Sequence, residues 1–176
     1  MPSSKSRNKK YVPRKVKMPG ILDNLPVPVM MLKKLANDMD NRVLRLRFAG
    51  NNGKDLAALV MYFATAWVLA GEMANGQELR DKLENGVREL GKAVLSSPDA
   101  VHGPMYDTIL DLTAITTAVV AESTKKEYRE ASERIKSDGV VPFADEFLVV
   151  LAQANLLRIV NAEKDSAQPQ PVAQQA

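Results

Sequence analysis

The chain has 176 residues, a length that suits one domain with tails. It contains no cysteine and a single histidine, which excludes disulfide bonds and thiolate metal sites and most zinc or histidine-based acid–base chemistry. The net charge of +3 combines +10 over residues 1–54 with −7 over residues 55–176, an asymmetry that points to an interaction tail.

No membrane-targeting segment is predicted. The basic start is not followed by an apolar stretch of the length that a signal peptide needs. The longest uncharged run, residues 56–71, has sixteen residues, whereas a membrane span requires roughly 20. We interpret this run as a buried central helix.

Residues 1–26 are predicted to form a tail and linker. Ser, Lys and Asn dominate the first ten positions, and repeated prolines rule out a long helix. Residues 4–20 hold seven Lys and Arg and no acidic residue. A few hydrophobic residues, among them Ile21, Leu22 and Leu25, would let the later part of the tail lie along the body or along a partner.

The first helix is predicted to begin near Pro28, because proline is tolerated at the first helical position. Its apolar residues recur at spacings of four and three and therefore share one face. They are Leu32, Ala36, Met39, Val43 and Leu46. The segment AGNNG at residues 49–53 indicates a turn, since Gly and Asn tolerate positive φ.

The second helix, from about residue 54 to 73, is apolar nearly all round. A helix of this kind is normally surrounded by neighbours, so we place it at the centre of the fold. The third helix, about 77–95, has a one-sided apolar stripe. Its Gly86 and Gly91 each weaken it by about 1 kcal/mol relative to alanine, so they mark candidate points of close helix approach.

A fourth helix is predicted from near Pro104. Its inward face is Met105, Ile109, Leu112, Ile115 and Val119. TKKE at residues 124–127 matches a capping box, in which the Thr caps the backbone and the Glu reaches back to it. This favours a separate fifth helix to about residue 136, and one continuous long helix stays open as the alternative. DGVVP at residues 138–142 ends the segment.

Residues 143–162 are predicted to form the last helix. Val149 and Val150 would also suit a strand, but twenty residues without a turn signal favour a helix. Because this segment is very apolar, it should be covered either by the rest of its own chain or by a second copy. It is therefore a candidate contact for a homo-oligomer.

Together these elements predict an all-α bundle of five to six helices with an apolar central helix, at residues 27–163. A basic tail at residues 1–26 precedes it. Residues 164–176 are polar and contain Pro and Gln, a composition that predicts a disordered C-terminal tail.

Several short segments, taken in order, resemble a known pattern. They are RNKKYVPRKV at 7–16, RVLRLRFAGNNGKDLAALV at 42–60, LAGEM at 69–73 and TILDLTAITTAVVAESTKKEYREASERI at 108–135. The series resembles a loose group of small, mostly uncharacterised helical proteins of proteobacterial phages and prophages, which share a basic Lys-Tyr-x-Pro-Arg/Lys start. The resemblance spans residues 7–136 and leaves out the helix at 143–162. It implies a phage-related origin, in the bacterial cytoplasm or the virion, and transfers no catalytic residue.

Two local patterns were weighed as catalytic or ligand sites. GNNGKD at residues 50–55 has too few residues between its glycines for a phosphate-binding loop, so Lys54 is interpreted as a surface residue at a helix start. His102 lies in a loop near Asp99, without a second histidine or an acidic cluster. A surface or capping role is favoured over a metal ligand or general base.

One acidic pair and one aromatic group are further candidates for a site. Asp107 and Asp111 lie four residues apart, a spacing that more often places solvated acids on a helix than a catalytic pair. Tyr62, Phe63 and Trp67 are interpreted as core, because proteins that bind single strands interleave aromatics with Lys and Arg. No enzyme activity, cofactor or metal is expected.

The basic N-terminal run leaves three interpretations open. It could be a solubilising leader, it could neutralise phosphates of DNA or RNA, or it could dock on an acidic protein or an anionic membrane. Contact with nucleic acid, weakly sequence-specific, is favoured. The predicted nucleic-acid-binding residues are Lys5, Arg7, Lys9, Lys10, Tyr11, Arg14, Lys15, Lys17, Arg42, Arg45 and Arg47. The alternative function is a protein–protein interaction module, a host-protein inhibitor or a virion component, that acts through its helical surface.

Overall fold

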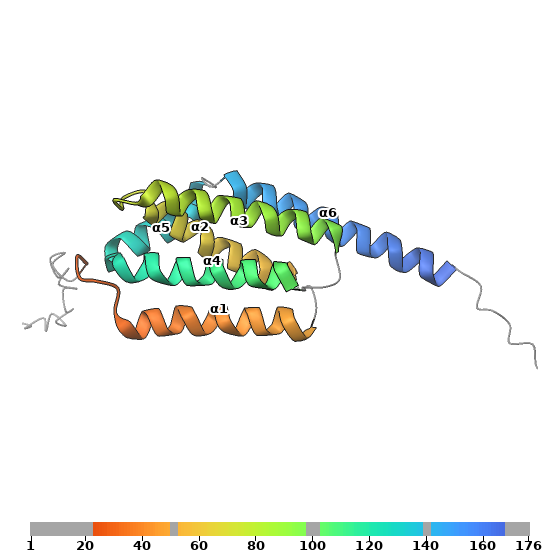
Figure 1. Ribbon diagram of the computed structural model, residues 1–176, viewed down its shortest axis with the longest axis horizontal. Helices are drawn as coiled ribbons and strands as arrows, with labels where there is room; N and C mark the ends of the chain where they lie inside the picture. Colours follow the sequence, from red (N-terminus) through yellow and green to blue (C-terminus); the bar gives the residue numbers. More distant parts are fainter. Residues whose placement is uncertain (1–22, 50–52, 98–102, 139–141, 168–176) are drawn as a thin grey trace, which may run out of the picture.

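The computed structural model of the chain describes residues 23–49, 53–97, 103–138 and 142–167. Over these ranges it contains six helices and no strand, so the predicted all-α bundle is confirmed. Figure 1 shows α1 along the lower edge, α4 above it, and α3 and α6 along the upper edge. The helices are α1 (Val29–Ala49), α2 (Gly53–Ala70), α3 (Gly76–Ser96), α4 (Gly103–Glu122), α5 (Lys125–Asp138) and α6 (Pro142–Ala167).

The helix α2 lies at the centre, as its sequence predicts. It contacts each of the other five helices. Among the described helices, α2 alone has the length and hydropathy of a membrane span, and 56% of it is buried inside the bundle. The five neighbouring helices cover the apolar surface of α2 on its different sides.

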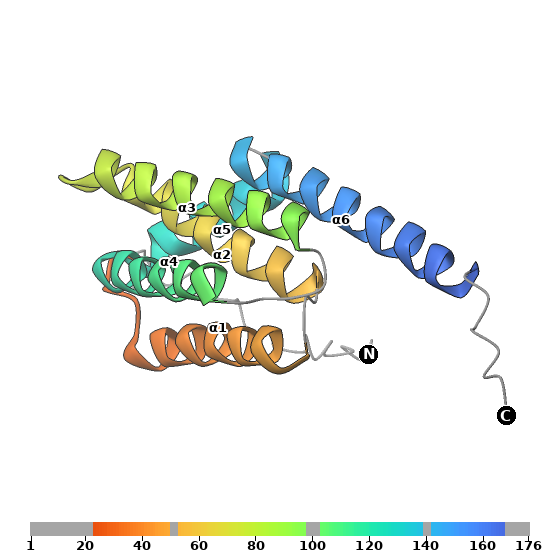
Figure 2. The same cartoon turned by 45° about the vertical axis from the view of Figure 1, so that its right-hand side comes forward.

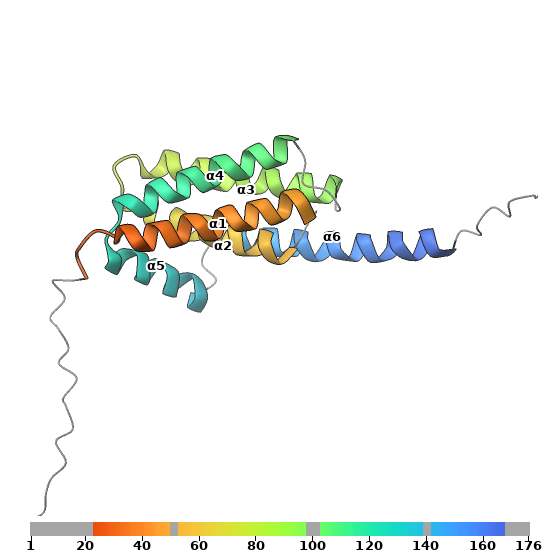
Figure 3. The ribbon, with the colours of Figure 1, turned by 90° about the horizontal axis from the view of Figure 1, so that it is seen from below.

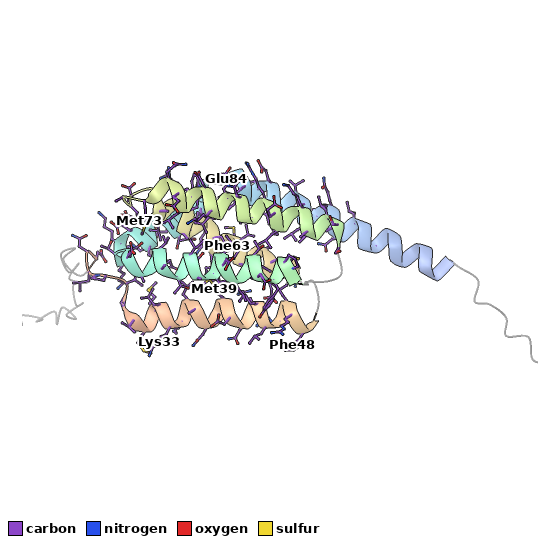
Figure 4. The ribbon with its side chains drawn as sticks, viewed as in Figure 1. Lys33, Met39, Phe48, Phe63, Met73 and Glu84 are labelled. Carbon is purple, nitrogen blue, oxygen red and sulfur yellow. The ribbon has the colours of Figure 1, made fainter. Side chains whose placement is uncertain are left out.

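The apolar faces of α1, α3 and α4 meet α2 in one core. Figure 4 shows Met39 and Phe63 between the helices, whereas Lys33 and Phe48 lie on the outer side of α1. Burying a large aliphatic side chain contributes about 1.5–3 kcal/mol, so these stripes supply most of the force that assembles the helices. Fully buried large residues include Met39, Leu46, Phe63, Leu83, Leu90 and Ile109.

Helix α2 ends at Ala70, three residues before its predicted end, because a turn over residues 71–75 follows. The side chain of Arg80 stabilises this end. Its Nε donates to the backbone oxygen of Trp67 at 3.0 Å, and its guanidinium lies 4.3 Å from the centre of the Trp67 ring. A carbonyl at the helix end thereby gains a hydrogen-bond donor.

The helices α4 and α5 are separate, and the predicted capping box joins them. The N–H of Thr124 donates to Oε2 of Glu127 at 2.8 Å, and the N–H of Glu127 donates to Oγ1 of Thr124 at 3.2 Å. The pKa of Glu127 is lowered, first by the bond from the backbone N–H of Thr124 to its carboxylate and then by the side chain of Thr124. The alternative of one continuous helix is therefore wrong.

Gly86 and Gly91 differ in their surroundings. A Cβ on Gly86 would lie 2.7 Å from Cδ2 of Leu112, so α3 and α4 approach closely there, as predicted. A Cβ on Gly91 would meet Phe147 of α6 at 3.7 Å, an ordinary contact. Gly91 therefore does not mark a close approach.

Helix α6 is longer than predicted. It continues to Ala167, so residues 164–167, which were expected in the disordered tail, are helical. The reason is local, because neither Pro nor Gly occurs between Phe143 and Ala167 to stop the helix.

A short segment ahead of α1 is bound to the bundle, although residues 1–26 were predicted to be tail and linker. We call residues 23–27 the anchor segment. Val27 is only 4% exposed, and three backbone hydrogen bonds tie the segment to the corner between α4 and α5. The bonds run from the N–H of Val27 to Ser123 O (3.0 Å), of Lys125 to Leu25 O (2.9 Å) and of Lys126 to Asp23 O (2.9 Å).

Candidate nucleic-acid interface

Most residues predicted to bind nucleic acid lie outside the described residues. We call residues 5–17 the basic run. It contains Lys5, Arg7, Lys9, Lys10, Tyr11, Arg14, Lys15 and Lys17, whose role stays a prediction. The other three predicted residues, Arg42, Arg45 and Arg47, lie on α1.

Helix α1 exposes a basic face at the edge of the bundle. It packs against α2 and α4, and its other side is open, as Figure 3 shows from below. It carries five Lys and Arg against two Asp. Lys33 and Lys34 are exposed near its start. Cationic residues therefore occur before the anchor segment, in the basic run, and again just after it, on α1.

Arg42 and Arg45 bind carboxylates of their own chain. Arg45 holds Asp55 with two bonds, from Nε to Oδ2 at 2.9 Å and from Nη2 to Oδ1 at 2.7 Å. Arg42 joins two acids, with Nε 2.8 Å from Oδ2 of Asp38 and Nη1 3.0 Å from Oδ1 of Asp55. Tyr62 donates its hydroxyl to Asp38 at 2.7 Å. These five residues form what we call the charge cluster between α1 and α2.

The charge cluster lowers the pKa of its two carboxyl groups and raises that of its phenol. Hydrogen bonding from Arg45 lowers the pKa of Asp55, whose side chain is 6% exposed, and bonds from Arg42 and Tyr62 lower that of Asp38. Burial, with the bond to Asp38, raises the pKa of Tyr62 to about 12. At neutral pH the cluster thus pairs two carboxylates with two guanidinium ions and a neutral phenol.

This geometry gives Arg42 and Arg45 a structural role. They hold α1 against the first turn of α2, where the carboxylate of Asp55 also suits the positive end of the helix dipole. A phosphate that binds either arginine would compete with these carboxylates. Contact between these two residues and nucleic acid remains a prediction.

Arg47 lies elsewhere on α1, within an aromatic group that the sequence reasoning missed. Its guanidinium is 5.8 Å from the ring centre of Phe48 and 5.2 Å from that of Tyr106 on α4. Phe48 is 80% exposed. An exposed ring beside an arginine is the kind of pair on which an unpaired base stacks. The sequence feature that indicates this group is Phe48, an aromatic residue that lies outside the apolar stripe of α1.

Basic residues also lie at the corner that holds the anchor segment. Lys125 and Lys126 are exposed at the start of α5. Arg129 forms an ion pair with Asp23, with Nη2 3.4 Å from Oδ2. The anchor segment therefore enters the bundle beside cationic side chains of α5.

The remaining candidate residues within the described ranges do not come together in a second site. Asp107 and Asp111 are exposed on α4, and within the described ranges no group of three acidic or histidine residues is placed to hold a metal ion. Phe63 is fully buried, as the core interpretation predicts, and Trp67 packs edge-on against Phe143 with ring centres 6.0 Å apart. His102 lies outside the described residues.

A groove of about 620 Å³ runs between α3 and α4. Its inner wall is formed by Gly86, Leu112 and Ile115, which are buried or half-buried. Exposed carboxylates, including Asp81 and Asp111, line its edges. This surface differs in charge from the outer side of α1.

The chain was compared with protein-family models, curated proteins and solved structures. No family model matches it, and no curated protein or solved structure is significantly similar to it.

Proposed function

We propose that the protein contacts nucleic acid, with little sequence preference, through its basic run, and that it is a non-enzymatic accessory protein of phage type. The observation that supports the contact most directly is the place of the basic run in the sequence. The run ends five residues before the anchor segment, which three backbone hydrogen bonds fix to the bundle, and α1, with its exposed Lys33 and Lys34, follows. The phage type is supported by the resemblance of residues 7–136.

The physical basis of the contact is release of counterions from phosphates. Each phosphate that a Lys or Arg neutralises contributes about −0.9 to the slope of log K against log salt for duplex DNA. Seven such contacts from the basic run give a slope of about −6. Lys33 and Lys34 add to it when they reach the same duplex.

The test is a salt titration of binding to labelled duplexes of two unrelated sequences, followed by fluorescence anisotropy. The full chain is compared with a variant that has glutamine at all seven basic positions of the run. We expect similar affinity for both duplexes, a slope of about −6 to −8 for the full chain and a slope between about −2 and 0 for the variant.

A matched control keeps the seven basic residues but shuffles the order of residues 5–17. It should bind as the full chain does, because charge rather than a motif carries the contact. Absence of binding at low salt, or an unchanged affinity after removal of the seven charges, would refute the proposal.

A protein partner is the second candidate function, and the groove between α3 and α4 favours it. An apolar wall with acidic edges suits a helix that has an apolar face flanked by Lys or Arg. Capture of a partner that survives nuclease and loss of the basic run, but not Ile115→Glu, would favour this function. Ala118→Glu, at an exposed position of the same helix outside the groove, serves as the control.

A further inference from the structure

We propose that α6 pairs with α6 of a second copy, antiparallel, through an outer apolar stripe. The inference concerns self-association and is independent of the contact with nucleic acid. It starts from the fact that α6 is apolar on two opposite faces. The inner face packs on α2 and α3 through residues such as Phe143, Phe147 and Leu151.

The described part of the chain leaves the outer face of α6 open. Leu148, Val149, Leu156 and Ile159 are 44%, 57%, 63% and 57% exposed. Figures 1 and 2 both show the C-terminal part of α6 running past the end of the other helices. Of the two coverings that the sequence predicts, the described residues of the same chain cover the inner face of this helix, and cover by a second copy stays a prediction.

The spacing of the outer residues specifies a helix as the occupant. Val149, Ala152, Leu156 and Ile159 recur at intervals of three, four and three, which is the seam of a coiled coil. We call these four residues the outer stripe. A lipid surface fits less well, because helices that lie on membranes carry Lys and Arg beside their apolar face. Among the side chains of α6 that the structure describes, the exposed charged ones are Asp145 and Glu146, both acidic.

The outer stripe is complementary to itself in the antiparallel direction. With the two-fold axis at residue 154, Val149 meets Ile159 of the second copy and Ala152 meets Leu156, so each layer pairs a larger side chain with a smaller one. Parallel pairing would place Ala152 on Ala152, which leaves a gap in that layer.

The neighbours of the stripe and the shape of the molecule favour the same arrangement. Gln153 and Asn155, which flank the centre of the stripe, are uncharged and do not repel their counterparts. Figure 3 shows α6 running past the ends of the other helices, so antiparallel pairing about residue 154 puts the two bundles at opposite ends of the paired helices.

The test is the molar mass of the full chain by light scattering and sedimentation from 5 to 500 µM. A four-layer helix pair buries less than a standard interface of about 1,200–2,000 Å², so a concentration-dependent rise from 19.3 kDa toward twice that value is expected. Measurement in 0.5 M salt separates it from the proposed function, because salt releases nucleic acid but not apolar contacts.

Two double variants carry the test. Leu156→Glu with Ile159→Glu should raise the dissociation constant at least ~100-fold, with unchanged helix content by circular dichroism. Leu44→Glu with Leu110→Glu makes the same change on exposed leucines of α1 and α4 and should leave the dimer intact. A full chain that stays monomeric at 500 µM, or a dimer that the α6 variant does not weaken, overturns the proposal.

Cross-linking tests the direction of pairing, since the chain has no cysteine of its own. Ala152→Cys mixed with Leu156→Cys should form the mixed disulfide faster than either variant links to itself. Faster self-linking of each variant would mean parallel pairing and overturn the register. A monomeric chain that sediments with phosphatidylglycerol vesicles through Leu156 and Ile159 would assign the stripe to lipid instead.

Discussion

Helices α1 and α6 both lie at edges of the bundle, yet they are held and exposed in opposite ways. Helix α1 combines buried apolar residues with the charge cluster, in which Arg42 and Arg45 bind Asp55 of α2. Helix α6 packs on α2 and α3 mainly through apolar residues such as Phe147. Outside, α1 presents basic residues and α6 presents the outer stripe.

The difference teaches how one small bundle can offer two kinds of contact. A basic face suits a polyanion and weakens with salt, whereas an apolar stripe suits a helix and is little affected by salt. The charge cluster contributes to this division, because it fixes the orientation of α1 and balances the charge of two of its arginines. Three predictions probe this contrast, from the largest expected effect to the smallest.

Phe147→Ala should lower the free energy of unfolding by about 3–5 kcal/mol, because the side chain is 2% exposed and its loss leaves a cavity between α6 and its neighbours. Phe48→Ala makes the same change on α1 at a position that is 80% exposed, and should stay within about 0.5 kcal/mol. Urea denaturation measures both, and equal effects would contradict the account of α6 packing.

Asp55→Asn should lower the free energy of unfolding by about 2 kcal/mol at pH 7, because charge-assisted bonds to Arg42 and Arg45 are weakened. The folded state lowers the pKa of Asp55 from its ordinary value of 3.8. The contribution of the carboxylate is thus complete above that value and is lost as pH falls through the lower, folded one.

Urea denaturation from pH 7 to pH 2 should therefore show the difference between the wild type and Asp55→Asn shrinking in acid. Asp40→Asn, on the exposed side of α1, is the control and should change stability by less than about 0.5 kcal/mol at pH 7. A difference that is constant down to pH 2 would argue against a charged Asp55 in the cluster.

Lys33→Glu with Lys34→Glu should weaken binding to duplex DNA about tenfold at low salt, because two charges next to the anchor segment are reversed. Lys82→Glu with Lys92→Glu reverses two exposed charges on α3 and should have a smaller effect. Anisotropy measures both. An equal loss of affinity in the two double variants would mean that net charge, and not the position of the charges on α1, contributes to the affinity.

The helices and their inner faces could be predicted because the signals are local. Apolar spacing placed Met39 and Leu46 in the core, and the all-round apolar character of α2 required neighbours on every side. The break before α5 followed from a capping box of four residues, whose two hydrogen bonds depend on no distant contact.

The site could be predicted less well because its contacts are distant in sequence. Arg42 and Asp55 are thirteen residues apart on two different helices, so their pairing depends on how α1 and α2 pack together. The anchor segment is bound through backbone atoms, which leave no residue pattern. Phe48 was overlooked because exposure depends on what the fold leaves uncovered.

The anchor segment also sets a route for mechanical load. Tension on the basic run, as when a bound polymer is pulled away, arrives first at three backbone bonds on the corner between α4 and α5. These bonds resist before the first turn of α1 can unwind. The anchor segment therefore protects α1 from tension applied to the basic run. Without these three hydrogen bonds, the same tension would act directly on the first turn of α1.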